Sequence, residues 1–163
     1  MTTAQGTSST EEPVITIVRE FDAPRELVFK AWTDPEQLKQ WWGPEGFAVP
    51  RCEVDLRPGG AWRIDMQGPD GTIYPNKGIY LEVVVPEKLV TTDDVDADET
   101  AWGDTPPPSS TNTMLFEETD GKTRLTTITR LQTIEQRDAM LEMGAEAGWN
   151  ESLDKLARLL ATV

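Results

Sequence analysis

The sequence contains no histidine and a single cysteine, and both absences limit its chemistry. Without histidine, Ser–His–Asp and Cys–His catalysis, imidazole acid–base chemistry and ordinary zinc sites are excluded. The lone Cys52 cannot form an internal disulfide, which fits a reducing compartment. Its place on the apolar face of a predicted strand indicates a buried, inert thiol. An enzyme built from this chain would have to use carboxylates, Lys, Arg, Tyr, Cys or bound water.

Basic residues are few relative to acidic ones. There are 15 Lys and Arg residues against 29 Asp and Glu residues, which gives a formal net charge of −14 at pH 7. A surface of this sign repels phosphate backbones and anionic membranes, so we expect no nucleic-acid partner and no membrane partner. No stretch approaches the ~20 apolar residues of a membrane span, and the N-terminus lacks the basic and apolar pattern of a signal peptide. The sequence therefore predicts a cytoplasmic location.

The length of 163 residues predicts one domain behind a short tail. Residues 1–12 are polar and offer nothing to bury, so we expect a disordered tail, with the folded domain spanning residues 13–163. Patterns of alternating or β-branched residues predict seven strands, at residues 14–21, 47–56, 61–67, 79–85, 88–94, 111–118 and 123–131. Two short helices are expected after the first strand, beginning near Pro24 and Pro35, where proline suits the first turn.

The last thirty residues predict one long amphipathic helix. Thr133 and Gln136 form a capping box, and no proline follows. An apolar stripe recurs at helical spacing, formed by Leu141, Ala145, Trp149, Ser152, Leu153, Leu156 and Leu160. The first half adds apolar surface away from this stripe, from Met140, Met143 and Ala147, and holds two interior glycines, Gly144 and Gly148. That half is therefore either covered twice or faces a space that something else fills.

The order of the predicted elements indicates an α+β fold. Strands joined by short turns imply an antiparallel sheet, because parallel pairs need crossover connections. The final helix is the only predicted element large enough to cover the apolar face of such a sheet. Because a curved sheet and a straight helix do not match everywhere, a cavity between them is physically plausible.

Six short motifs occur in an order typical of a known family. They are Trp32-Thr-Asp-Pro35, Trp41-Trp42-Gly-Pro44, Asp55-Leu-Arg-Pro-Gly-Gly60, Met66-Gln-Gly-Pro-Asp-Gly71, Gly78-Ile-Tyr-Leu-Glu82 and Gly148-Trp-Asn-Glu-Ser-Leu153. Over residues 13–162 the chain resembles bacterial proteins similar to the C-terminal domain of the activator of the ninety-kilodalton heat-shock ATPase, in the START-like SRPBCC superfamily. The resemblance implies a helix-grip fold, in which a seven-stranded antiparallel sheet wraps around a long C-terminal helix and leaves a deep pocket. It implies no particular reaction, since the superfamily spans binding, transport and catalysis and includes polyketide cyclases.

Our leading hypothesis is a soluble protein that binds a hydrophobic small molecule between the sheet and the final helix. The candidate ligand-binding side chains are aromatic or contain sulfur: Phe47, Trp62, Met66, Tyr80, Met114, Phe116, Met140 and Met143. The alternative is that these residues pack a solid core, which is the commoner fate of apolar side chains. Trp149 is assigned to the core. No cofactor and no metal ion is expected.

Two other function classes stay open at this point. One is an enzyme of the cyclase, aromatase or hydrolase kind, in which Tyr80 or a carboxylate with a raised pKa would move protons. Asp65 and Glu82 are the candidate carboxylates, with Arg63 beside them, although the alternation favours a solvated outer face with ion pairs. The other is a co-chaperone-type interaction module. The chain has no room for the eukaryotic namesake's N-terminal domain, so no stable chaperone partner is expected, and homodimer formation is left open.

A polar, proline-rich segment follows the fifth predicted strand. Asp94-x-Asp96-x-Asp98 resembles the start of a calcium loop, but Glu99 stands where that loop needs glycine and Thr105 stands where it needs glutamate. A solvated acidic loop is therefore favoured over a metal site. The stretch from residue 96 to 110 is expected to be either a lid anchored by Trp102 or disordered.

Overall fold

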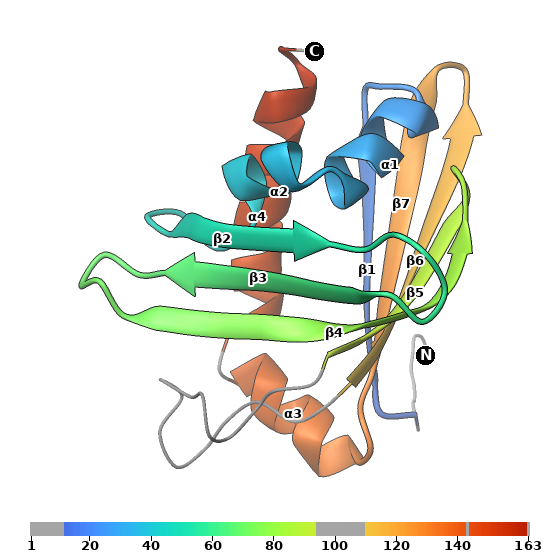
Figure 1. Ribbon diagram of the computed structural model, residues 1–163. Coiled ribbons are helices and arrows are strands. Elements are labelled where there is room, and N and C mark those ends of the chain that lie inside the picture. Colours follow the sequence, from blue (N-terminus) through green and yellow to red (C-terminus); the bar gives the residue numbers. More distant parts are fainter. Residues whose placement is uncertain (1–11, 94–109, 143, 163) are drawn as a thin grey trace.

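The computed structural model describes residues 12–93, 110–142 and 144–162 (Figure 1). The elements follow in the order β1 (Val14–Phe21), α1 (Arg25–Thr33), α2 (Pro35–Trp41), β2 (Ala48–Val54), β3 (Ala61–Gln67), β4 (Ile73–Val84), β5 (Lys88–Asp93), β6 (Ser110–Thr119), β7 (Lys122–Arg130), α3 (Ile134–Glu142) and α4 (Ala145–Leu160). Residues 1–11 of the predicted tail, the predicted acidic loop and Trp102 lie outside the described residues. In the described part of the chain, no helix is long and apolar enough to cross a membrane.

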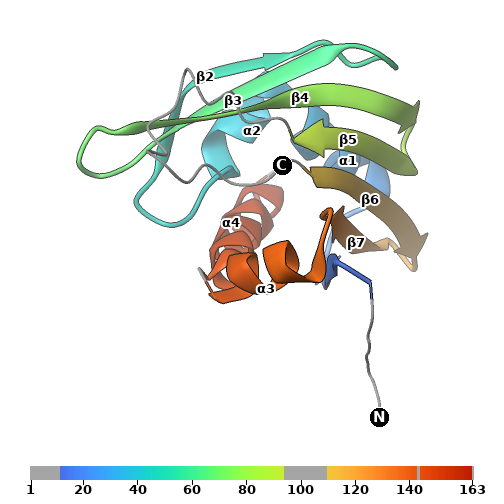
Figure 2. The same ribbon diagram turned by 90° about the horizontal axis from the view of Figure 1, so that it is seen from below.

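All seven strands form one antiparallel sheet in the order β1-β7-β6-β5-β4-β3-β2. β1 and β2 are consecutive in the chain but occupy opposite edges, and α1 and α2 carry the chain from one edge to the other. The sheet is strongly curved, and Figure 2 shows it as an arch with α4 on its concave side. This is the α+β helix-grip arrangement predicted from the sequence.

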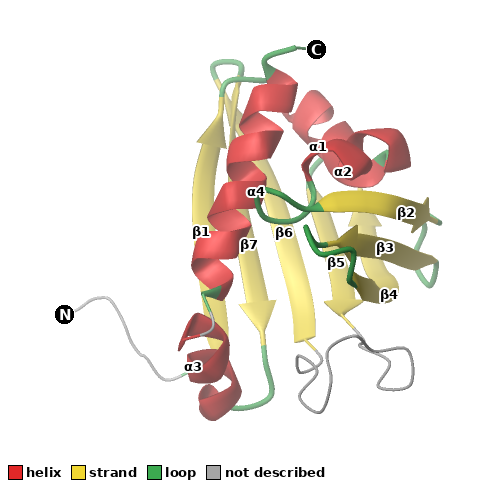
Figure 3. Cartoon of the chain, turned by 90° about the vertical axis from the view of Figure 1, so that its left-hand side faces the viewer, coloured by secondary structure: helices red, strands yellow, loops and turns green. Residues whose placement is uncertain are grey.

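The two short helices are fixed by the residues that begin them. Asp34 is the N-cap of α2, and its side chain accepts a hydrogen bond from the Glu36 amide at 2.9 Å, while Pro35 occupies the first turn. The buried Trp41 then donates its indole N–H to the Ala31 carbonyl oxygen at 2.9 Å, which ties α2 to α1. Both helices pack at one end of α4, and α3 lies at the other end (Figure 3).

The C-terminal segment differs from the single continuous helix predicted for it. The capping box is present, since Thr133 accepts from the Gln136 amide at 3.1 Å, but the helix breaks before α4. Gly144 adopts a left-handed conformation with φ of +87°, which ends the hydrogen-bonded run. The break also changes the rotational phase, so Leu141 is 41% exposed while Met140 faces the core. The predicted stripe is therefore correct for α4 and wrong for α3.

β4 begins six residues earlier than the sequence predicts. Within it, Gly78 allows the backbone of β5 to approach closely. Gly78 pairs with Trp62 of β3, and on its other side the backbone of β5 comes very close. A Cβ atom placed at position 78 would overlap the carbonyl oxygen of Thr92 and lie 2.9 Å from the indole nitrogen of Trp62. Both strands are held by their ladders, so the chain needs glycine here.

We expect Gly78→Ala to destabilise the protein by roughly 2–3 kcal/mol or more, because the added methyl group would force β4 and β5 apart. Gly148→Ala in α4 is the matched control. Its nearest neighbour would be Pro44 Cγ at 3.7 Å, and alanine favours a helix by about 1 kcal/mol over glycine. Urea unfolding of both variants measures the difference. Equal stabilities would show that the contact at Gly78 is not a constraint.

Candidate functional site

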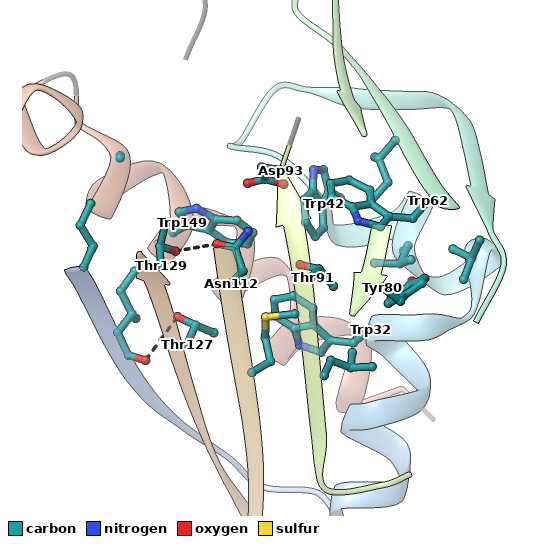
Figure 4. A pocket seen from close by; sticks show the side chains of 18 of the residues that line it. Trp32, Trp42, Trp62, Tyr80, Thr91, Asp93, Asn112, Thr127, Thr129 and Trp149 are labelled. Atoms are coloured by element: carbon teal, nitrogen blue, oxygen red, sulfur yellow. Dashed lines mark hydrogen bonds between the residues drawn. The ribbon is translucent and has the colours of Figure 1, made fainter. Parts of the chain in front are cut away.

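A cavity lies between the concave face of the sheet and α4 (Figure 4). The volume that the centre of a water molecule can occupy inside it is about 60 Å³. For a rounded shape this corresponds to roughly 200 Å³ between side-chain surfaces, enough for a compound of one or two rings. The lining residues come from every strand and all four helices: Ile15, Ile17, Trp32, Leu38, Trp42, Val54, Trp62, Ile64, Tyr80, Leu89, Thr91, Asp93, Asn112, Met114, Thr127, Thr129, Met140, Ala145 and Trp149.

Four tryptophans form one continuous wall of this cavity. Trp149 of α4 stacks on Trp32 of α1, with ring centroids 6.1 Å apart and an interplanar angle of 12°. Trp42 meets Trp149 edge to face at 5.1 Å, and Trp62 of β3 lies 6.4 Å from Trp42. These large, flat side chains join helices to sheet while leaving space between them.

The buried indole N–H groups of Trp32 and Trp62 have no hydrogen-bond partner among the described residues. Trp32 and Trp62 are 5% and 6% exposed, and no described residue accepts from their Nε1 atoms. A buried donor left unsatisfied costs about 1–3 kcal/mol. The contrast with Trp41, whose N–H is satisfied by a backbone carbonyl, shows that the fold could have provided such partners. The cavity wall thus holds two buried donors without acceptors of their own.

The opposite wall is polar and comes from β5, β6 and β7. The Thr129 hydroxyl donates to Asn112 Oδ1 at 2.8 Å, and the Thr127 hydroxyl donates to the Ile17 carbonyl oxygen at 3.4 Å. The Ser110 hydroxyl donates to Asp93 Oδ2 at 3.3 Å. Figure 4 shows Asp93 at the end of the cavity where Trp42 and Trp149 also lie.

Asp93 has an unusual acidity. Burial raises the pKa of its carboxyl group from 3.8 to about 6, although hydrogen bonds from the Asn112 and Ser110 side chains act in the opposite direction. No Lys or Arg is found among the described residues that line the cavity, and no described basic side chain forms an ion pair with Asp93. Among the described lining residues, Asp93 is therefore the one carboxylate, and only dipoles compensate its charge there.

The loop after α2 is held against α4 by the half-buried Lys155. Lys155 Nζ donates to the carbonyl oxygens of Gly43 at 3.1 Å and Pro44 at 3.4 Å, and burial lowers the pKa of this amine. Because Trp42 immediately precedes Gly43, this contact fixes the Trp42 ring beside Trp149. The position of the aromatic wall depends on this link between α4 and the loop.

The chain as a whole matches a known family. The family model for activator of Hsp90 ATPase homolog 1-like proteins matches residues 22–161. The chain belongs to this family. The resemblance found in the sequence motifs is thereby confirmed.

Solved structures of bacterial proteins agree with the family assignment. Protein NE0264 from Nitrosomonas europaea is 33% identical, with a TM-score of 0.81 over 91% of this chain and 94% of that protein. A protein from Arthrobacter aurescens is 30% identical, with a TM-score of 0.83 over 93% of this chain and 88% of its own. The AHSA1 protein from Silicibacter pomeroyi is 30% identical, with a TM-score of 0.75 over 91% and 98% of the two chains. No curated protein matches this chain in sequence.

Half of the ligand-binding residues predicted from the sequence line the cavity of this family member. They are Trp62, Tyr80, Met114 and Met140. Burial raises the pKa of the Tyr80 hydroxyl well above its usual range, so this group is a neutral hydrogen-bonding partner. Trp149, which the sequence assigned to the core, lines the same cavity.

The other predicted residues lie elsewhere. Phe116 is 1% exposed and does not line the cavity; its ring centroid lies 5.2 Å from that of Phe29. Phe47 packs beside Tyr74 with ring centroids 6.1 Å apart, and Met66 packs beside Gly43. Met143 lies outside the described residues.

The charged candidates are not at the cavity either. Asp65 is buried and forms an ion pair with Arg63 at 3.0 Å, and Glu82 pairs with Lys88 at 3.1 Å. None of these residues lines the cavity, so an acid–base role there does not fall to Asp65 or Glu82. Burial raises the pKa of the Cys52 thiol to about 11, in keeping with an inert thiol. Within the described ranges, no cluster of His, Cys, Asp or Glu residues could hold a metal ion.

Sequence reasoning missed Asp93 and Asn112, although the required pattern is present. Asp93 follows the buried Leu89 and Thr91 at intervals of two, which places all three on the concave face. Asn112 likewise shares a face with Met114. A polar residue that continues an inward-facing alternation marks either a strand end or a polar site, and here it marks the polar wall.

We expect Asp93→Asn to stabilise the ligand-free protein, and the gain should depend on pH. The folded state binds the Asp93 proton more tightly than the unfolded state, so this residue lowers stability progressively as pH rises from about 4 through about 6. Asp93 is partly buried, so we discount the full pKa effect. The gain for Asn is roughly 2 kcal/mol at about pH 8 and about half of that at about pH 5.

Urea unfolding at the two pH values measures this gain. The control is Asp120→Asn, which removes a carboxylate from a hairpin turn with φ of +55°, where asparagine is equally suitable. A destabilised Asp93→Asn variant at about pH 8 would show that hydrogen bonds to the carboxylate outweigh its burial.

Proposed function

We propose that this protein binds a small, largely apolar molecule in the cavity between its sheet and α4. The observation that carries the proposal is the wall itself: four tryptophans surround a space that no described side chain fills. A tightly packed core would be more stable than one with a cavity, because void-lining atoms lose their dispersion contacts. An apolar occupant would restore those contacts.

The two unsatisfied indole N–H groups indicate that the ligand carries an acceptor. A carbonyl, ether or hydroxyl oxygen near Trp62 or Trp32 would satisfy a donor that is already buried. Since these side chains are buried before binding, little further desolvation opposes the new hydrogen bond. This favours oxygenated aromatic compounds over pure hydrocarbons.

The size of the cavity limits the apolar area that a ligand can bury, and this area limits its binding affinity. A single-ring ligand would remove about 150–200 Å² of apolar surface from water, worth roughly 4–5 kcal/mol at about 25 cal/mol per Å². This corresponds to a Kd of about 0.1–1 mM for a fragment. A natural ligand that fills the cavity more completely would bind more tightly.

Isothermal titration calorimetry with acetophenone tests the proposal. We expect Ala145→Leu, which places added methyl groups in the cavity, to weaken binding at least about tenfold. Ala147→Leu is the matched control, because Ala147 is an exposed residue on the same helix and its substitution should leave the Kd unchanged. The acceptor is tested with α-methylstyrene, which replaces the carbonyl oxygen with a CH2 group and should bind several-fold more weakly.

Two results would contradict this function. If Ala145→Leu and Ala147→Leu weaken acetophenone binding equally, the ligand lies outside the cavity. Failure of both compounds, and of a mass-spectrometric screen of hydrophobic metabolites, would remove the case for a binding protein. Stronger binding of α-methylstyrene would leave the cavity as the site and reject the indole donors as its polar contacts.

A second candidate function, an acid–base enzyme, is favoured by Asp93. A carboxyl group with a pKa of about 6 in an apolar cavity suits proton transfer near neutral pH. The Asp93 carboxylate would remove a proton from the carbon next to a ligand carbonyl, and an indole N–H would stabilise the resulting enolate oxygen. The proton would then return to the same carbon.

This reaction can be followed without knowing the natural substrate. In deuterated water, exchange of the acetophenone methyl protons should be catalysed by the wild-type protein and be slower by about a hundredfold with Asp93→Asn. Proton NMR measures the exchange rate. Equal rates in the two proteins, with binding intact, would leave a binding protein without this activity.

A further inference from the structure

The charges around the cavity restrict the ligand further than its apolar walls do. Asp93 is the one Asp or Glu in the described lining, and the described lining contains no Lys or Arg. A fatty acid, a phosphate ester or any other anion would therefore meet a carboxylate and no cation. Such a ligand would be repelled at close range in a medium of low dielectric constant.

A neutral ligand fits the walls but leaves the carboxylate uncompensated. Asp93 receives hydrogen bonds from Ser110 and Asn112, which are uncharged, and no described basic side chain faces it. Asp93 is partly buried, and a charge withdrawn from water without a counter-charge is a costly feature for a fold to retain. A cation supplied by the ligand would remove that cost.

The tryptophan wall also favours a ligand that carries a positive charge. The face of an indole ring attracts a cation more strongly than any other side-chain ring, and amines and alkylammonium groups are often bound inside a set of aromatic rings beside a carboxylate. Trp42 and Trp149 meet edge to face at 5.1 Å, and Figure 4 shows both rings at the Asp93 end of the cavity. The aromatic wall and the acidic group thus meet at one place.

We propose that the cavity selects an organic cation, an amine or alkylammonium group on a small aromatic or apolar body, with its charge between Asp93 and the rings of Trp42 and Trp149. This inference rests on the proposed binding function and specifies the ligand class for the same cavity. The apolar body would lie against Trp62 and Met114, which line the same cavity. Asp93 and the rings of Trp42 and Trp149 are sufficient to hold the charged group.

Three compounds with the same ring and different charges test the proposal in the wild-type protein. They are 2-phenylethylamine, 2-phenylethanol and phenylacetate, titrated by calorimetry near neutral pH. We expect the amine to bind at least tenfold more tightly than the alcohol, and phenylacetate not to bind measurably. This ranking needs no variant, so it holds whatever the effect of a substitution on folding.

The matched pair Asp93→Asn and Asp120→Asn assigns the effect to one carboxylate. Both substitutions remove one negative charge from the same chain, but Asp120 lies in a hairpin turn and not in the cavity lining. Asp93→Asn should weaken amine binding to the level of the alcohol. Asp120→Asn should leave the amine at least tenfold tighter than the alcohol.

The outcomes separate this inference from the function on which it rests. If the alcohol binds as tightly as the amine, or if Asp93→Asn leaves amine binding intact, the cation preference is wrong and the apolar binding site stands. If phenylacetate binds best, the charge argument is reversed and the inference fails. If none of the three compounds binds while acetophenone does, the cation preference is wrong and the apolar binding site stands.

Discussion

The structure depends on how tryptophans hold α4 away from the sheet. Trp32 comes from α1, Trp42 from the end of α2 and Trp149 from α4, and their rings stack or meet edge to face at 5.1–6.1 Å. Rigid rings of this size set the spacing between the helices and the concave face. α4 then runs closest to β1 and α2, and the middle of the sheet is left facing a cavity. Lys155 secures the arrangement by binding two carbonyl oxygens of the loop that carries Trp42.

Most of the architecture follows from local sequence patterns, and the departures have local causes. β1 and β3 have the predicted limits because their alternation is regular and their ends are marked by turn residues. β4 was predicted too short because Pro75, Asn76 and Gly78 are poor strand formers, and its first half is a strand through pairing with β3. Gly144 was predicted to lie inside one continuous helix, but its left-handed conformation, with φ of +87°, separates α3 from α4.

The sequence predicted which face of each strand points inward, but not which residues along that face line the cavity. Met66 shares the inward face of β3 with Trp62, and Phe116 shares that of β6 with Met114, yet only Trp62 and Met114 line the cavity. Alternation identifies which side chains point inward, whereas the helices decide which stretch of the inward face is covered. That decision involves contacts more than a hundred residues apart in sequence, such as Lys155 with Gly43. No periodicity within a strand carries this information.

The tryptophan wall also gives the molecule an optical property. Four of the five described tryptophans line the cavity, and the ring centroid of the fifth, Trp41, lies 4.8 Å from that of Trp32. Rings this close exchange excitation energy, so ultraviolet light absorbed by one of them is shared among the group. The fluorescence of these five rings therefore originates at the cavity, and an occupant that quenches one ring dims the others with it. These tryptophans are intrinsic fluorophores located at the cavity where a ligand would bind.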